Sequence, residues 1–304
     1  MENTFLINKC MLIPNEGSSL KEEYDITLGN PIIDYYESIE SPSISMTITF
    51  IDIDQVIGRK GITGGEYIDV IVKTDDEDAD DFKVMHDKQK MMLNSVRNMV
   101  TESNKQVATL EFVSVETIVN ETARLNKKFT GNISQTVLDI LTKDEKGIKT
   151  KKKVFGPKKE KLGETDVEED RATNSYSFVG NLKRPFDTIQ WLCPKGQSAN
   201  DDFGFLFYET LDGYHFRSIK SLLEQDAITY QQTDSQGLSN KILQNNLNQS
   251  NDIGMNMRMG MYANRTIYVD IENQNTEVVD FKASDIKLNK PATLLTGIED
   301  YPTR

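Results

Sequence analysis

The residue types that most often perform catalysis are scarce in this chain. Its 304 residues include two histidines, His86 and His215, and two cysteines, Cys10 and Cys193. A Ser-His-Asp or Cys-His system needs a histidine within reach of a nucleophile and of a third group that orients it. His86 lies in a polar segment, and His215 has an aromatic residue on each side. This setting predicts a partly packed sheet residue at position 215 and gives no evidence of a nucleophilic centre.

Sequence motifs of enzymes are missing as well. There is no HExxH, P-loop, GxGxxG or GxSxG sequence, and Gly61–Gly65 lacks the lysine of a phosphate-binding loop. The 48 acidic residues leave open a carboxylate pair that cleaves a glycosidic bond, but no pair lies in an apolar setting that would single it out. We therefore predict no catalytic residues, no cofactor and no enzymatic activity.

Metal binding has two weak candidates. The block Asp75–Asp81 is almost wholly acidic, but it lacks the glycine and the closing glutamate of a calcium-binding EF-hand loop. The two cysteines are far apart and have no CxxC spacing. We predict a solvated loop tip at 75–81, no metal site, and two free thiols, as expected for synthesis in a reducing cytoplasm.

The net charge of −13 argues against wrapping around DNA, because such binding needs lysines and arginines that neutralise phosphates. Two interpretations stay open: the charge provides solubility, or it forms a surface that nucleic acid passes without binding. No apolar run approaches the roughly 20 residues that cross a bilayer. The N-terminus has no basic region of a signal peptide. We expect no stable membrane insertion.

Residues 1–120 have the pattern of an antiparallel β domain. Ile44–Ile53 and Val107–Val119 alternate apolar and polar residues, which is the period of a half-buried strand. Tyr67–Val72 is rich in β-branched residues. Several strands separated by turns, with little helix signal, predict a small barrel or sandwich.

The character of the sequence changes near residue 120. Asn132–Thr142 has helical spacing, with Asn132 as the N-cap. Lys143–Lys161 is basic and Glu164–Asp170 is acidic. A nucleic-acid site is possible there, but the acids would cancel much of the field. We therefore predict a flexible surface loop over 143–172. If this loop becomes ordered, a partner subunit is the most natural cause.

The segment that follows the loop predicts a helix and a β-hairpin. The helix starts at Pro185, a residue favoured in a first turn, and includes Trp191. The strands Asp201–Thr210 and Tyr214–Ile219 flank an Asp-Gly turn, and a short helix over Ser218–Gln225 follows. Trp191 and the stripe Phe203–Phe207 are expected in the core.

Residues 229–304 carry weaker signals. Ser239–Gly254 is rich in amides with some helical spacing, and Met255–Tyr262 alternates methionine with other residues, which favours a strand. Arg265–Ile271 and Thr276–Phe281 predict a second hairpin.

One stretch carries a family resemblance. Residues Arg184–Ile219, with RPFDTIQWL and GFLFYETLDGYHFRSI, resemble the central baseplate hub proteins of T-even-like contractile phages and their cyanophage relatives. YYESIESPSISMTITFID within Ile32–Ile53 and MYANRTIYVD within Met261–Asp270 are also similar to parts of these proteins.

The resemblance implies a mainly β fold with an α+β insertion. Tube-like antiparallel β-barrels would lie at 1–120 and 229–304, and the second would be incomplete because the family is longer than this chain. The outer α+β domain would lie at 121–228. Whether this homologue is compact or the sequence is truncated stays open.

The resemblance also implies a location and partners. The protein would be part of the virion, in the tail baseplate, as a homotrimer that adapts the sixfold tail tube to the threefold central spike. Its partners would be the central spike protein, the tail tube or tube initiator protein and baseplate wedge proteins, and DNA would pass through its channel without specific binding. The alternatives are a tail tube initiator, a hub-like component of a secretion spike, or a cell-wall-degrading tail enzyme.

Overall fold

The computed structural model describes residues 5–53, 55–62, 64–74, 81–102, 105–162, 165–167, 169–199, 204–225, 253–260 and 262–282. The chain forms two units, residues 1–241 and 242–304. The acidic block at 75–81 lies almost entirely outside the described residues, and so do the segment 239–252 and Phe203. The boundary predicted near residue 228 also falls outside them.

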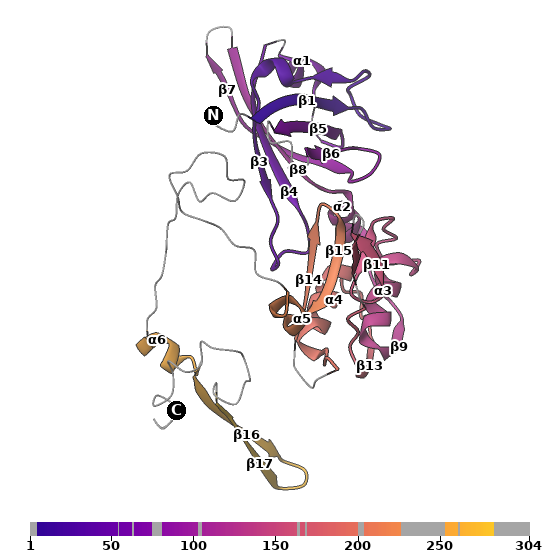
Figure 1. The fold of residues 1–304 in the computed structure, drawn as a ribbon, viewed down its shortest axis with the longest axis vertical. Coiled ribbons are helices and arrows are strands. Elements are labelled where there is room, and N and C mark those ends of the chain that lie inside the picture. Colours follow the sequence, from indigo (N-terminus) through magenta and orange to yellow (C-terminus); the bar gives the residue numbers. More distant parts are fainter. Residues whose placement is uncertain are drawn as a thin grey trace. The chain divides into compact units, whose positions relative to one another are not determined.

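The first unit begins with one antiparallel sheet (Figure 1). Its eight strands are β1 (Phe5–Ile13), β2 (Tyr24–Asp25), β3 (Ile32–Tyr36), β4 (Ser45–Asp52), β5 (Tyr67–Thr74), β6 (Phe82–Val84), β7 (Met91–Glu102) and β8 (Lys105–Ser114). The order is β2-β1-β5-β7-β8-β4-β3, with β6 added beside β5. The short helices η1 (Thr27–Gly29) and α1 (Val56–Lys60) lie between strands. The end strands β2 and β3 are not paired with each other among the described strands. The helix η1, which follows β2, contacts β4 near the other end, so the sheet curves back on itself as an open barrel.

The alternation seen in the sequence builds the core of this barrel. Along β4, Met46, Ile48 and Phe50 are buried, and the residues between them are half-buried. Phe112 of β8 and Leu12 of β1 join the same core. Side chains from successive strands therefore meet inside the curved sheet, as the period of two requires.

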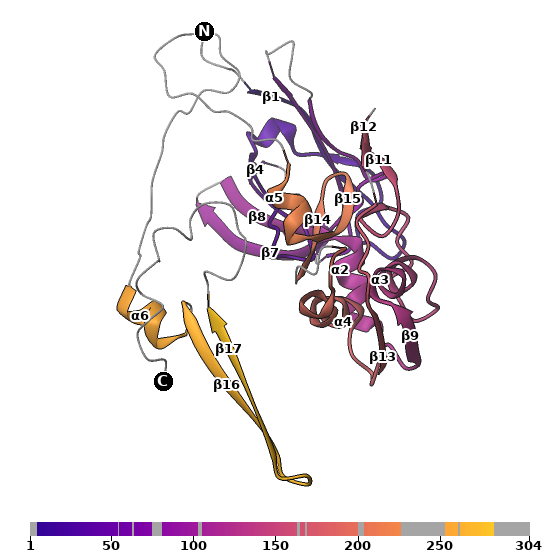
Figure 2. The same ribbon diagram turned by 60° about the horizontal axis from the view of Figure 1, so that its bottom comes forward.

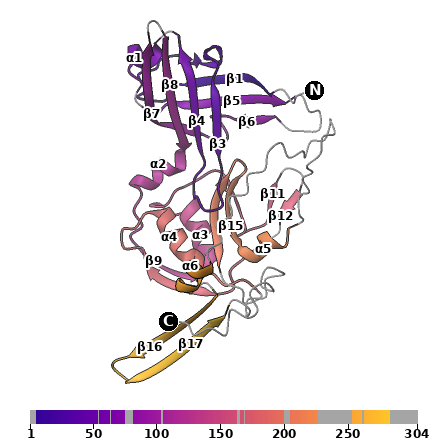
Figure 3. The same ribbon diagram turned by 90° about the vertical axis from the view of Figure 1, so that its left-hand side faces the viewer.

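The prediction of one strand over Val107–Val119 is wrong in its second half. The strand β8 ends at Ser114, and the helix α2 (Val115–Thr122) follows directly. In the sequence the alternation of apolar residues continues beyond Ser114, where the strand ends. Glu116 nevertheless lies in the first turn of a helix, where the helix dipole favours a carboxylate. Figure 3 shows α2 leaving the barrel at the end of β8.

The rest of the first unit is an α+β assembly. Its further elements are β9 (Lys128–Asn132), α3 (Ile133–Thr142), β10 (Lys153–Phe155), β11 (Glu160–Leu162), β12 (Thr165–Val167), β13 (Ser175–Val179), α4 (Pro185–Leu192), η2 (Cys193–Lys195), β14 (Phe205–Thr210), β15 (Gly213–Ser218) and α5 (Ile219–Leu223). A three-stranded sheet has the order β10-β15-β14, and β9–β13 and β11–β12 form two-stranded sheets. Figure 2 shows α3 and α4 next to each other, near β9 and β13.

Several local predictions are confirmed here. The Asn132 side chain accepts a hydrogen bond from the backbone of Gln135 as the N-cap of α3, and Pro185 begins α4. The hairpin β14–β15 turns at Leu211–Asp212. Phe205 and Phe207 are buried in the core with Tyr214 and Phe216, while Trp191 is half-buried at its edge.

The prediction of a flexible loop over 143–172 is wrong for its central part. Strand β10 pairs in parallel with β15, and Val154 and Phe155 are buried in the core. Gly156 has a φ of +100°, and a Cβ there would lie 1.9 Å from the carbonyl oxygen of Phe216. The cluster of lysines in the sequence hid the strand β10, which forms one edge of the three-stranded sheet.

The second unit consists of α6 (Ile253–Arg258), β16 (Ala263–Asp270) and β17 (Asn275–Lys282) among its described residues. The hairpin predicted from Arg265–Ile271 and Thr276–Phe281 is confirmed. The strand predicted for Met255–Tyr262 is wrong, because residues 253–258 form a helix. Met255, Met257 and Met259 are exposed there, so their spacing reflects no sheet core.

The fold is therefore mainly antiparallel β with an α+β part, as predicted from the sequence. Within the described residues, no helix is long and apolar enough to cross a membrane.

Candidate functional site

A buried cluster of charges joins the barrel to the α+β part of the first unit. On the barrel side are Ser114, the last residue of β8, and Glu116 in the first turn of α2. On the α+β side are Glu209 of β14 and Thr150 and Lys152, which precede β10. We call these five residues the junction network.

Lys152 is the centre of the junction network. Its Nζ lies 2.6 Å from Glu209 Oε1, 2.9 Å from Glu116 Oε2 and 2.8 Å from Ser114 Oγ. An ammonium group has three hydrogens to donate, so every one has an acceptor. The Lys152 side chain is 9% exposed and that of Glu209 is 0% exposed. The geometry is that of a fully satisfied buried ion cluster.

The remaining oxygens of the cluster are satisfied from both sides of the junction. Glu209 Oε2 accepts the backbone N–H of Ile44, which directly precedes β4, at 3.1 Å. Glu116 Oε1 accepts the hydroxyl of Thr150 at 2.7 Å. The barrel backbone thus contacts a carboxylate of the α+β part, and a hydroxyl of the α+β part contacts a carboxylate next to the barrel.

Burial and attraction set the protonation of the cluster. Burial alone would lower the pKa of Lys152, but its attraction to Glu209 and Glu116 raises that pKa above its ordinary value. Burial alone would raise the pKa of Glu116, but Lys152 and the hydroxyl groups lower it. For Glu209, which is fully enclosed, burial prevails over Lys152 and the pKa is raised.

Two carboxylates with pKa values shifted in opposite directions are also a feature of acid–base catalysts. Here the ammonium group of Lys152 occupies the position between them, and Glu209 is closed to solvent. The arrangement can hold two parts of a protein together, but it leaves no room for a substrate between the carboxyl groups.

Further contacts extend the junction along α2 and the hairpin β14–β15. The backbone N–H of Leu211, in the hairpin turn, donates to Glu37 Oε1 at 2.6 Å, and Leu211 packs against the barrel core. The amide oxygen of Asn120, near the end of α2, accepts the N–H of Phe186 in the first turn of α4 at 2.8 Å. Exposed Arg184 pairs with Glu121.

The two histidines have structural partners. His86 lies between β6 and β7, and its Nδ1 is 2.7 Å from Oδ1 of buried Asp69. Burial would raise the pKa of Asp69, but hydrogen bonds from Lys9 and His86 lower it. His215 stacks on Phe155 and Tyr208, and burial together with Arg217 lowers its pKa to about 4. His215 is therefore a packed sheet residue, as the sequence predicted.

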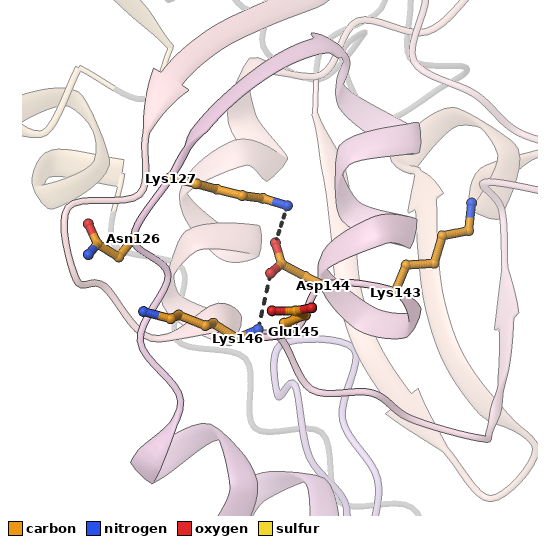
Figure 4. Close-up of a pocket in the computed structure, with 6 residues that line it drawn as sticks. All are labelled: Asn126, Lys127, Lys143, Asp144, Glu145 and Lys146. Atoms are coloured by element: carbon orange, nitrogen blue, oxygen red, sulfur yellow. Dashed lines mark hydrogen bonds and ion pairs between the residues drawn. The ribbon is translucent and has the colours of Figure 1, made fainter.

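A pocket with a volume of about 300 Å³ lies beside α3 (Figure 4). It is lined by Asn126, Lys127, Lys143, Asp144, Glu145 and Lys146. Lys127 points at Asp144, with 2.7 Å between Nζ and Oδ2, whereas Lys143 points away and pairs with Asp139. The lining has no histidine, cysteine or hydroxyl group, so it supplies no nucleophile with a base.

Cys10 and Cys193 are free and buried, and burial raises the pKa of each thiol to about 12. Thiols with such a pKa are inert as nucleophiles. In the part of the chain that the structure describes, no three or more His, Cys, Asp and Glu side chains are grouped as metal ligands.

Little in the sequence singles out the junction network. Lys152 stands within a run of three lysines, and Glu116 and Glu209 are two of 48 acids. One signal was present for Glu209, because it lies on a strand with apolar residues on both faces. A carboxylate on such a strand needs a cation, and the nearby lysine-rich segment supplies it.

Comparison with solved structures finds phage tail proteins and a secretion-system protein. A prophage tail protein of Listeria monocytogenes matches with a TM-score of 0.43 and 9% identity, over 92% of this chain and 68% of that one. A tail protein of Neisseria meningitidis matches with a TM-score of 0.38 and 11% identity, over 68% of this chain and 49% of that one. An E. coli component of the type VI secretion system, described as similar to T4 tail proteins, matches with a TM-score of 0.35 and 10% identity, over 74% and 49%.

The chain spans about half the length of the Neisseria and E. coli proteins that it matches. No protein-family model matches the sequence, and comparison with curated proteins finds no match.

Proposed function

We propose that this protein is a structural component of a phage tail, and specifically the central hub of a contractile-tail baseplate. In this role three copies form a ring that adapts the sixfold tail tube to the threefold central spike. The tube or its initiator, the spike and the wedge proteins are the partners, and the protein is part of the virion.

The proposal rests on the position of the segment Arg184–Ile219 in the fold. The segment Arg184–Ile219 resembles baseplate hub proteins in sequence, and it forms the helix α4 and the hairpin β14–β15. Glu209 and Leu211 of this hairpin are the residues that contact the barrel. The resemblance therefore falls on the part of the chain that fixes the barrel to its neighbour.

A fixed junction suits this role. A ring that adapts a sixfold tube to a threefold spike needs barrels that keep their orientation. Breaking a buried ion pair costs about 3–5 kcal/mol. The junction network places such a pair, with all donors satisfied, between barrel and α+β part.

The same features support a structural role over an enzymatic one. Lys152 fills the space between Glu116 and Glu209, and each histidine has a structural partner. A zymogram on cell-wall material tests this point: we expect no clearing, and a cleared band would identify a cell-wall-degrading tail enzyme instead.

The net charge of −13 supports passage of DNA without binding, since a channel with acidic walls repels phosphates. Imaging of the purified chain with its tail tube and spike tests the whole proposal. We expect a threefold ring between the two. A sixfold ring would favour a tube initiator, and a chain that binds neither partner would contradict a tail role.

A further inference from the structure

The hydroxyl group of Ser114 lies between two carboxylate oxygens of the junction network. Its Oγ is 2.7 Å from Glu116 Oε2 and 2.9 Å from Glu209 Oε1. A serine hydroxyl has one hydrogen to donate, so it can satisfy one of these two oxygens. Lys152 Nζ donates to the same Oγ at 2.8 Å and places no hydrogen between Oγ and either carboxylate. One of the two oxygen–oxygen contacts is therefore one hydrogen short.

The charges of the junction network do not balance either. Glu116 and Glu209 bring two negative charges, and Lys152 is the one cation that the described residues place beside them. The Glu209 side chain is 0% exposed, so water does not screen the surplus negative charge there. A buried surplus charge is costly, and proton binding removes it. The surplus of one negative charge matches the one missing hydrogen.

The groups that face Glu209 from the neighbouring strands add no positive charge. The backbone N–H of Ile44, before β4, donates to its Oε2. Tyr214 on β15 and Tyr35 on β3 stay neutral, because burial and the negative charge of Glu209 raise the pKa of each hydroxyl. Glu37, which accepts the Tyr35 hydroxyl at 2.6 Å, brings a further negative charge. These surroundings favour the neutral form of Glu209.

The proton belongs on Glu209 and not on Glu116. Glu116 lies in the first turn of α2, where the helix dipole favours a negative charge, and its side chain is 12% exposed. Its other oxygen accepts the hydroxyl of Thr150. Glu209 lies on a strand and is closed to solvent. Burial accordingly raises the pKa of Glu209, whereas at Glu116 the effect of burial is outweighed by Lys152 and the pKa is lowered.

We propose that the junction network binds one proton on Glu209 Oε1, which donates to Ser114 Oγ, and that this proton strengthens the contact between the barrel and the α+β part. The Ser114 hydroxyl then donates to Glu116, so each oxygen–oxygen contact has its hydrogen. When the proton is absent, Glu209 is ionised and paired with Lys152, and the network is one hydrogen short.

The proton couples the junction to pH. Opening of the junction exposes Glu209 to water, where its pKa returns to the ordinary 4.5, so opening releases the proton. The added stability is complete below pH 4.5 and is lost as the pH rises through the higher pKa of the closed junction. Acid therefore keeps the junction closed, and a higher pH makes it easier to open. This coupling does not depend on the proposed function.

The backbone amide of Ile44 reports the charge of Glu209 from the barrel side. Its N–H donates to Glu209 Oε2 at 3.1 Å, so its NMR chemical shift changes when the carboxyl group gains a proton. The amide of Ile57 is the control, because it donates at 3.0 Å to a different buried carboxylate, that of Asp52. Both amides are followed from about pH 8 to about pH 4 in the full chain, in Glu209→Gln and in Ser114→Ala. Hydrogen exchange of the same amides is measured across this range.

We expect the Ile44 shift to titrate with a midpoint above 4.5 in the unmodified chain. The protection of this amide against exchange should rise as the pH falls through the midpoint, by up to about tenfold per pH unit. Glu209→Gln should abolish both changes and Ser114→Ala should lower the midpoint, while the Ile57 amide behaves alike in all three proteins. His215 titrates in all three and cancels in the comparison.

A midpoint at or below 4.5 in the unmodified chain would overturn the proposal, and this result does not require any variant to fold. A higher midpoint that persists in Glu209→Gln would show that another group binds the proton. An unchanged midpoint in Ser114→Ala would contradict the hydroxyl as the acceptor of that proton. Protection that stays constant across the midpoint would contradict the link between the proton and the contact.

Discussion

Lys152 and Glu209 stand 57 positions apart in the sequence and form a 2.6 Å ion pair that is closed to solvent. The pair belongs to the α+β part, but its other ligands, Ser114 and the backbone of Ile44, belong to the barrel. The charges therefore hold three segments in one orientation. Each of these contacts is directional, because a hydrogen bond requires its donor and acceptor to be aligned.

Removing the cation should destabilise the first unit strongly. Lys152→Met leaves Glu116 and Glu209 buried without their counter-charge, so we expect the free energy of unfolding in urea to fall by about 3–5 kcal/mol. Lys151→Met is the control, because Lys151 is exposed and should change stability by less than about 0.5 kcal/mol. Equal effects of the two substitutions would show that the junction network contributes nothing.

The burial of His215 predicts a dependence of stability on pH. The pKa of His215 is about 4 in the folded chain and ordinarily 6.5, so the unfolded chain binds the proton first as pH falls. Stability should therefore fall as pH drops from about 6.5 to about 4, by up to about 3 kcal/mol, and level off below. His215→Phe retains the stacking on Phe155 and Tyr208 and should remove this contribution.

Unfolding in urea at a series of pH values in this window measures the effect. The other groups titrate in both proteins and cancel in the difference between them. The difference in stability between the unmodified chain and His215→Phe should therefore change with pH through His215 alone. A constant difference between the two would mean that His215 is not the group responsible.

The close approach of β10 to β15 predicts a strong effect at Gly156. Gly156→Ala places a Cβ 1.9 Å from the Phe216 carbonyl oxygen in addition to backbone strain at φ +100°. We expect a loss of at least about 3 kcal/mol. Gly17→Ala is the control, with φ +87° and no atom within 4 Å of the Cβ, and should cost only about 1–2 kcal/mol of strain. Thermal unfolding of both variants checks the difference, and equal losses would contradict the packing of β10.

The contact between α2 and α4 predicts a smaller loss. Asn120→Ala removes the acceptor for the Phe186 N–H in the first turn of α4, so we expect a loss of about 1–2 kcal/mol. Asn126→Ala, at an exposed asparagine, should be neutral. Thermal unfolding of the two variants gives the comparison, and an unaffected Asn120→Ala would mean that water replaces the amide oxygen.

Helix ends and turns were predictable from the sequence where they depend only on residues close by in the chain. Asn132 capped a helix, Pro185 began one, and Asp212-Gly213 closed a hairpin, because each depends on neighbours within a few positions. Residues 153–156 were missed because their role depends on β15, which lies about 60 positions away, as the pairing of Val154 with Tyr214 shows.

The candidate site was not predictable for the same reason. A lysine in a charged run usually faces water, and only the fold brings Lys152 against Glu209 and Glu116. The helix α6 was mistaken for a strand because alternating methionines have the period of a half-buried strand, although Met255, Met257 and Met259 are exposed.

The mass of the purified chain, alone and mixed with its spike and tube proteins, tests the central claim most directly. The account predicts a trimer that binds both, either preformed or assembled on the spike. A chain that stays monomeric in every mixture and binds neither protein would contradict it.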